Sequence, residues 1–324
     1  MNTNRGERGP YLHYKTANGR AWCGDSLDLL SDLPDNSINL ICTSPPFALT
    51  REKAYGNEKQ RDYVEWFVEF ADHFKRVLTS DGSLVIDIGG SWIPGSPTRS
   101  IYHFELLVTL VRDLGFHLAE EFYLFNRAKL PTPAQWVTIE RIRVKDAVNP
   151  IWWLSKTDRP IANNRHVLKP YSDAHRKLIE GAAYNSGVRP SGHVISNNFG
   201  QDNGGAIPPN LLEVANTSSN DPYNRYCNAN GISKHPARFP REVPEFFIKF
   251  LTEPGHLVLD PFAGSNMTGA LAEELGRKWL AYERDPDYLA GSVGRFEGAR
   301  GLDDSPTTPR ELSGRPARWW TIPQ

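Results

Sequence analysis

With 324 residues, 39% of them hydrophobic and 23% charged, the chain has the composition of a globular protein, and no apolar run approaches the roughly 20 residues of a membrane span. The formal net charge of −1 gives no overall attraction for nucleic acid, so any basic surface must be local. The three cysteines lack C-x-x-C spacing, which argues against a zinc site and a disulfide framework, and the polar residues 1–20 contain no export signal, so we expect a cytoplasmic protein.

The first half of the chain predicts alternating strands and helices after a loose arm at residues 1–12. Strands are expected at 21–25, 38–42, 83–88, 116–125 and 147–154, and helices at 26–30, 62–78 and 101–114. This order, ending in two consecutive strands, indicates an α/β fold with a mostly parallel sheet and an antiparallel hairpin at its edge.

The strand at 38–42 runs into Thr43-Ser44-Pro45-Pro46-Phe47. Proline has no N–H and restricts the residue before it, so the strand must stop here, at the sheet edge where open α/β sheets bind ligands. The carbonyls of Ser44 and Pro45 lack amide partners in the next turn, and Phe47 supplies a flat wall. Such a pocket suits a planar ring with an amino group, although Pro-Pro also occurs as simple loop punctuation.

Two acids near predicted strand ends are candidate site residues. Asp87 lies in a buried strand, where a carboxylate is costly unless it is paired or functional. It either caps the loop at Gly89-Gly90 or lies within reach of Ser44. Asp25 either contacts a ligand or caps the helix that follows it.

Two segments are locally basic. Residues 127–145 hold five basic residues against one acid, and residues 156–189 hold seven against three. These segments are either solvated loops or contacts to DNA phosphates. Residues 185–230 contain ten asparagines, most of which we expect to form turns, while a few could read adenine edges. We interpret this stretch as an inserted recognition region rather than core.

The last third predicts a helix at 244–251, a strand at 256–260, a glycine turn, a helix at 270–276 and a strand at 278–282 closed by Glu283. Strand, glycine turn and helix are typical of a nucleotide site, and Glu283 is placed to bind ribose hydroxyls. The turn matches neither G-x-G-x-x-G nor the P-loop pattern. The tail at 300–324 is expected to be poorly ordered.

The turn Asp260-Pro261-Phe262-Ala263-Gly264-Ser265 resembles the S-adenosylmethionine motif, and the run at 43–47 resembles the catalytic motif, of amino-group DNA methyltransferases. The catalytic motif comes first, which is the permuted order of the β class, and the likeness is greatest to the PvuII type of cytosine-N4 enzymes. It covers most of residues 11–299, including Tyr55-Gly56-Asn57. Met267 and Phe47 depart from the residues that are commoner in the family.

This resemblance implies a Rossmann-like methyltransferase fold with a catalytic half at 13–156, a target-recognition region at 157–230 and a cofactor half at 231–299. The implied catalytic residues are Ser44, Pro45, Pro46, Phe47 and Asp87. The implied S-adenosylmethionine contacts are Asp25, His235, Pro236, Asp260, Phe262, Gly264, Ser265, Thr268 and Glu283. The implied DNA contacts are Arg127, Lys129, Arg141, Arg143 and Lys145.

The resemblance also implies the reaction, which is methyl transfer to the N4 amine of a flipped-out cytosine in double-stranded DNA, without metal or membrane. Serine at the first motif position favours cytosine, and adenine N6 is the alternative target. A cognate restriction endonuclease and a homodimer are candidate partners. Other classes to be tested against it are a nicotinamide oxidoreductase, a non-catalytic DNA-binding protein, and a protein or RNA methyltransferase.

Overall fold

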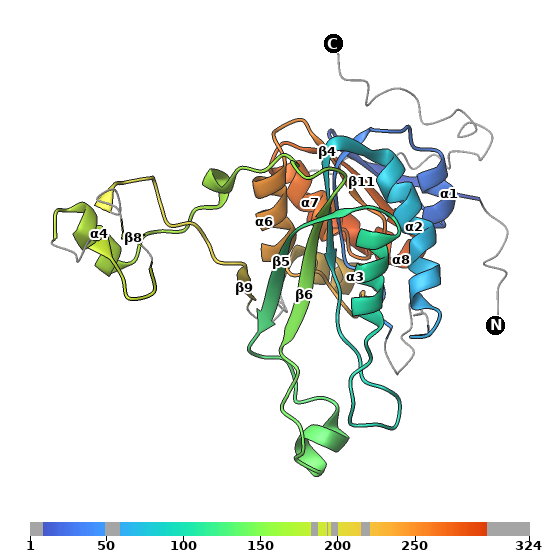
Figure 1. The fold of residues 1–324 in the computed structure, drawn as a ribbon. Coiled ribbons are helices and arrows are strands. Elements are labelled where there is room, and N and C mark those ends of the chain that lie inside the picture. The colour runs from blue at the N-terminus through green and yellow to red at the C-terminus, as the bar shows by residue number, and fades with distance from the viewer. Residues whose placement is uncertain are drawn as a thin grey trace.

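A computed structural model describes residues 9–48, 59–182, 187–192, 194–195, 200–214 and 221–296. A nine-stranded sheet forms its centre, and helices cover both faces, as the α/β prediction requires (Figure 1). In spatial order the strands are β1 (Tyr11–Lys15), β2 (Gly19–Cys23), β11 (Lys278–Glu283), β10 (Leu257–Asp260), β3 (Ile38–Thr43), β4 (Leu78–Asp87), β6 (Val148–Ser155), β5 (His117–Asn126) and β9 (Leu211–Val214).

The middle of the sheet is parallel, because β2, β11, β10, β3 and β4 all run in the same direction. β6 is antiparallel to both β4 and β5, which confirms the predicted hairpin. The hairpin does not form the edge, however, because β9 pairs outside β5, and β1 forms the opposite edge. Tyr11 and Leu12 therefore belong to β1 rather than to a loose arm, whereas residues 1–8 lie outside the described part of the chain.

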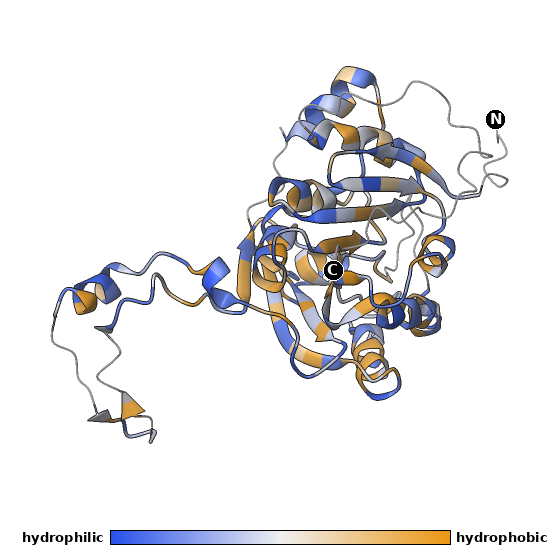
Figure 2. Cartoon of the chain, turned by 90° about the horizontal axis from the view of Figure 1, so that it is seen from above, coloured by the Kyte–Doolittle hydropathy of each residue, from blue (hydrophilic) through white to orange (hydrophobic). Residues whose placement is uncertain are grey.

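Each face of the sheet has its own apolar core. The helices α1 (Ser26–Ser31), α2 (Tyr63–Val77) and α3 (Tyr102–Arg112) cover one face, and α6 (Glu242–Leu251), α7 (Met267–Glu274) and α8 (Pro286–Ser292) cover the other. On α2 the spacing of Phe67, Phe70, Phe74 and Val77 places all four in the first core, as predicted. Burial of each such side chain contributes roughly 1.5 to 3 kcal/mol. Figure 2 shows the apolar residues concentrated in the strands at the centre.

The segment between β6 and β9 leaves the sheet and returns to it. Its helix α4 (Asp173–Ile179) and the short pair β7 (Gly187–Val188) and β8 (Val194–Ile195) lie away from the main body (Figures 1 and 2). In contrast, β9 joins the sheet and α5 (Pro222–Asn230) buries Tyr223 and Cys227. The expectation that all of residues 185–230 lie outside the core is therefore wrong for its last part. The assignment of DNA recognition to 157–230 stays a prediction.

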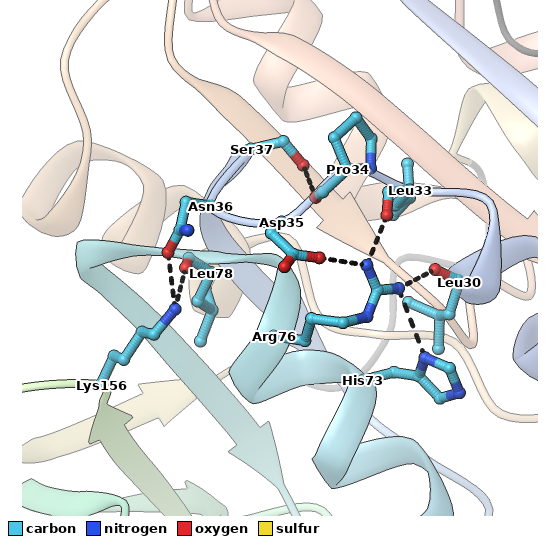
Figure 3. Close-up of polar contacts among 10 residues, drawn as sticks. All are labelled: Leu30, Leu33, Pro34, Asp35, Asn36, Ser37, His73, Arg76, Leu78 and Lys156. Carbon is cyan, nitrogen blue, oxygen red and sulfur yellow. Dashed lines mark hydrogen bonds and ion pairs between the residues drawn. The ribbon is translucent and has the colours of Figure 1, made fainter.

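At the amino end of β3, the side chains of Arg76 and Lys156 bind the loop that precedes the strand (Figure 3). Arg76 on α2 donates to the Leu33 carbonyl in this loop at 2.6 Å and to the Leu30 carbonyl in α1 at 2.7 Å, and it pairs with Asp35 at 2.8 Å. Lys156 donates to Asn36 Oδ1 at 2.7 Å. These contacts fix the start of the central strand. Its carboxyl end therefore also lies at a defined position.

Candidate active site

The carboxyl ends of five neighbouring parallel strands meet at one edge of the sheet, where open α/β sheets bind ligands. An acid closes or follows four of these strands, and β3 delivers the proline motif: Asp25 after β2, Glu283 on β11, Asp260 on β10, Asp87 on β4 and Ser44 after β3. The basic arm, which we define as residues 127–147, leaves the same edge, because β5 ends and β6 begins there (Figure 1).

Ser44 and Asp87 lie together, as neighbouring parallel strands predict. The Ser44 hydroxyl donates to Asp87 Oδ2 at 3.3 Å, and Asn149 Nδ2 donates to Oδ1 at 3.4 Å. Asp87 is only 4% exposed. Burial raises its pKa to about 6, against the opposing effects of the two hydrogen bonds and of the nearby Lys129 charge. A carboxyl group with this pKa can change its protonation state close to neutral pH.

Two tyrosines hold the proline loop and the neighbouring Gly89 in place. The Tyr63 hydroxyl donates to the Pro46 carbonyl at 2.9 Å, whereas no donor in the described part of the chain reaches the Pro45 carbonyl. The Phe47 ring packs against Gly89, where a Cβ atom would come within 2.4 Å of the ring. Tyr102 donates to the Gly89 carbonyl. The Pro45 carbonyl, one residue after Ser44, thus has no donor among the described residues.

Asp260 links the proline loop to the glycine turn. Its carboxylate accepts from the Thr43 hydroxyl and the Thr268 hydroxyl, both at 2.7 Å, and from the Phe262 amide at 3.1 Å. Burial raises the pKa of Asp260 to about 6, and these three hydrogen bonds oppose the shift. All three donors belong to the protein. The contacts of Asp260, including the one with Thr268, therefore stabilise the conformation of the turn.

The glycine turn packs closely against His235. Gly264 has φ +51°, and a Cβ atom there would come within 3.1 Å of His235 Nε2. His235 Nδ1 accepts from the Ala237 amide, so Nε2 carries the hydrogen, and burial lowers the pKa of this imidazole to about 4. Asn266, also at positive φ, caps α7, which therefore begins at Met267 and not at residue 270 as predicted.

Glu283 occupies the gap between the glycine turn and β2. Its two carboxylate oxygens accept from the amides of Gly264 and Asp285, both at 2.8 Å, and its backbone carbonyl accepts from Gly24. Burial raises the pKa of this carboxyl group. The carboxylate keeps capacity for a further donor, since it can accept about four hydrogen bonds.

The remaining candidate cofactor residues have different surroundings. Asp25 caps α1 by accepting from the Leu27 amide at 2.9 Å, as one of the two readings predicts, and remains exposed. The Phe262 ring packs 5.0 Å from that of Phe70, at the margin of the first core. Pro236 is exposed, and Ser265 is almost fully buried.

This set of groups fits S-adenosylmethionine better than a nucleotide phosphate. The carboxylates of Asp25 and Glu283 are acceptors, which suit the hydroxyls of a ribose and the amino group of an adenine. Two carboxylates at adjacent strand ends would repel a phosphate group. Because Gly264 packs closely against His235, there is no room for a side chain at position 264. The turn therefore presents its backbone, which a flat or apolar ligand can approach. No group of His, Cys, Asp or Glu suited to hold a metal occurs in the described residues.

Four of the five predicted DNA-contacting cations are already held by the protein. Arg127 pairs with Glu213 at 2.9 Å, Lys129 donates to Asn149 at 3.0 Å, and both Arg143 and Lys145 donate to backbone carbonyls. Among the described residues, Arg141 has no such partner. Arg127, Arg141, Arg143 and Lys145 are exposed, so contact with phosphates stays a prediction for them.

Sequence analysis missed two side chains that organise this edge. Asn149 stands opposite the end of β4 and contacts Asp87. Arg295, whose side chain is 4% exposed, donates to the Ser265 carbonyl at 2.6 Å and pairs with Asp221 at 3.2 Å. Neither belongs to a motif, and only the fold brings them to the site. No helix in the described ranges is long and apolar enough to cross a membrane.

Comparisons with known proteins agree with this geometry. A family model described as DNA methylase matches residues 38–293. The type II methyltransferase M.PvuII of Proteus hauseri is 53% identical over 285 residues, which cover 87% of this chain and 85% of the relative. The solved structure of a PvuII DNA methyltransferase (cytosine-N4-specific) matches with a TM-score of 0.72 and 46% identity over 88% of each chain. TTHA0409 from Thermus thermophilus, at 20% identity and a TM-score of 0.53 over 87% of this chain and 95% of its own, supports the fold alone.

Proposed function

The chain belongs to the DNA methylase family, and from that premise we propose that it transfers a methyl group from S-adenosylmethionine to the exocyclic N4 amine of cytosine in double-stranded DNA. One observation carries this proposal: the Ser44 hydroxyl donates its hydrogen to Asp87, so its oxygen lone pairs face away from the acid. Together with the Pro45 carbonyl they form a pair of acceptors. A pair of acceptors is what an amino group with two hydrogens requires.

The two acceptors activate the amine. The lone pair of an exocyclic amine is delocalised into the ring, which makes its nitrogen a poor nucleophile. Hydrogen bonds from the amine to the Ser44 oxygen and the Pro45 carbonyl pull the nitrogen toward a tetrahedral form, and fixed acceptors achieve this without reorganisation. After methylation the nitrogen must lose one proton. Ser44 Oγ takes this proton while its own hydrogen passes to Asp87 Oδ2, the atom it already contacts.

Glu283, Asp25 and the backbone of the glycine turn hold the cofactor, with Glu283 accepting from the ribose hydroxyls. When bound, S-adenosylmethionine supplies an electrophilic methyl group on a sulfonium. Asp260 keeps the glycine turn and the proline loop at a constant separation, because its carboxylate binds Thr43 on one side and Thr268 on the other.

The target base must leave the duplex to reach this edge, and Phe47 is positioned to stack on it. The ring is backed by Gly89, so it presents a fixed face. The exposed cations of the basic arm provide sequence-independent phosphate contacts, and residues 157–230 carry sequence recognition. A substitution within 192–210 should therefore change which sequence is modified. A double-stranded DNA substrate favours a cytoplasmic enzyme. Its role would be to protect sites from a cognate endonuclease, with which it forms no stable complex. A homodimer is a further candidate assembly.

The test is to express the chain in a host that lacks DNA methylation and to sequence the DNA by a method that distinguishes N4-methylcytosine from N6-methyladenine. We expect N4-methylcytosine within one short motif from the wild type and none from Ser44→Ala. N6-methyladenine would contradict the base assignment. A purified, folded wild type that modifies neither base would contradict the proposed reaction.

A further inference from the structure

A chain of three polar contacts connects the basic arm to Ser44. Lys129 Nζ donates to Asn149 Oδ1 at 3.0 Å, and Asn149 Nδ2 donates to Asp87 Oδ1 at 3.4 Å. The other carboxylate oxygen, Oδ2, accepts from Ser44 at 3.3 Å. The two oxygens of Asp87 therefore have separate tasks, since one faces the Asn149 amide and the other faces the serine.

The chemistry of the three groups fixes the direction of this chain. An ammonium group only donates hydrogen bonds, and an ionised carboxylate only accepts them. An amide that lies between them must turn its oxygen to the lysine and its NH₂ to the acid, because the opposite orientation would break both contacts. Lys129 thus fixes the rotamer of Asn149, and Asn149 fixes which oxygen of Asp87 is left for Ser44.

Lys129 lies at the root of the arm, and its position is itself fixed. It follows β5 by only three residues and is half-buried. The arm folds back on this point, because Lys145 Nζ donates to the carbonyls of Arg127 at 2.8 Å and Lys129 at 3.5 Å. A shift of the arm when DNA binds would therefore be transmitted to Lys129.

We propose, on the basis of the proposed function, that Asn149 and Lys129 are positioning residues that hold one oxygen of Asp87, favour its ionised form and so couple the acid to the basic arm. The contacts at 3.3 and 3.4 Å are long, and catalytic hydrogen bonds often shorten only when substrate is bound. Closure of the arm on DNA is the event that shortens them here. A larger fraction of Asp87 is then ionised, and so able to accept a proton, when the duplex is in place.

The surroundings of Asp87 make the lysine charge decisive. The titratable groups that face the acid are Cys42 from β3, Tyr102 from α3 and Lys129 from the arm, while Ser44 and Asn149 contribute uncharged donors. Burial raises the pKa of both the Cys42 thiol and the Tyr102 hydroxyl, so neither ionises near neutral pH. Lys129 is therefore the only charge of this set that opposes the burial of the Asp87 carboxylate. Its removal should raise the pKa of Asp87 above about 6.

The test compares the pH dependence of kcat for the wild type, Lys129→Met and Asn149→Leu, on a duplex that carries the motif modified by the wild type. We expect the acid limb of the profile to move up by about one pH unit in both variants, with kcat about tenfold lower on that limb and recovering at high pH. Lys129→Arg keeps the charge and should keep most of the wild-type limb. The matched control is Arg141→Gln, which removes a cation from the same arm and should raise KM for DNA without moving the limb.

Each outcome either supports or overturns the coupling between Lys129 and Asp87. A limb that stays in place in both Lys129→Met and Asn149→Leu would overturn it, and so would a loss of kcat that is equal at every pH, which marks a purely structural role. If Lys129→Met raises only the KM for DNA, the coupling is overturned and Lys129 is instead a phosphate contact. If Asn149→Leu fails to fold by circular dichroism, the Met and Arg variants of half-exposed Lys129 decide. Failure of the wild type to methylate cytosine would instead contradict the proposed function.

Discussion

The substitution Asp87→Asn tests whether Asp87 accepts a proton during catalysis or has only a structural role. The change removes a group with a pKa of about 6 while keeping its size and its ability to contact Ser44 and Asn149. Loss of a general base typically costs about 10²-fold or more in turnover, so we expect kcat to fall by at least that factor and its acid limb near pH 6 to disappear. Binding of DNA and of S-adenosylmethionine should change little, because Asp87 is not expected to contact the cofactor or the phosphates.

The same change should stabilise the protein at neutral pH. Folding raises the pKa of Asp87 from 3.8 to about 6, so the native state binds more protons than the unfolded state between these values, and the free energy of unfolding falls as pH rises through this window. The shift corresponds to about 3 kcal/mol that the wild type loses by pH 7 and that Asp87→Asn does not lose. Urea denaturation of both proteins at pH 4 and pH 7 measures this difference.

Asp260→Asn is the matched control, since it replaces another buried acid, with a similarly raised pKa, at the same edge of the sheet on β10, which β3 separates from β4. It should alter cofactor binding through the turn and not abolish the acid limb. The reasoning is refuted if folded Asp87→Asn has near wild-type turnover, in which case Ser44 and the Pro45 carbonyl act without the acid. It is equally refuted if both Asn variants lose the limb to the same extent.

Three further changes test the rest of the site. Glu283→Ala should weaken S-adenosylmethionine binding by about 1 to 3 kcal/mol in calorimetry, because hydroxyl donors lose their acceptor, and unchanged affinity would remove Glu283 from the cofactor site. Replacing Arg141 and Arg143 by glutamine should weaken binding to every duplex sequence in fluorescence anisotropy and flatten the salt dependence by about one unit of slope per lost phosphate contact; a changed target motif with the slope intact would reverse that assignment. Arg295→Met should lower both cofactor affinity and melting temperature, because the Ser265 carbonyl loses a buried donor; normal values of both would show that the turn holds its shape alone.

The strands that carry the chemistry could be predicted from the sequence because their signals are local. Short apolar runs, Leu40–Cys42 and Leu84–Ile86, lead into Thr43 and Asp87, and such runs are typical of strands buried on both faces. We expected consecutive strands of a doubly wound sheet to be neighbours, and the carboxyl ends of parallel strands share one edge. The observed contact between Ser44 and Asp87 agrees with this expectation.

The elements that were missed depend on partners distant in the chain. β9 is four residues long and alternates exposed and buried positions, and only pairing with β5, almost 90 residues earlier, makes it a strand. Lys129 illustrates the same limit for a side chain. Sequence groups it with the other cations of the arm, whereas the structure turns it toward Asn149, 20 residues away. Local composition cannot distinguish a cation that faces solvent from one that faces a buried amide.

Perturbed ionisation alone does not identify the catalytic acid at this edge. Burial raises the pKa of Asp87 and of Asp260 to about 6, so both would be functional candidates on that criterion. Their partners separate them. Asp260 receives three short hydrogen bonds, all from protein groups that it holds in place, and so is committed to structure. Asp87 receives two longer ones, and one comes from Ser44, the proposed acceptor for the amine. An acid needs spare accepting capacity next to a mobile proton to take that proton, and for this reason we propose a catalytic role for Asp87 and a structural role for Asp260.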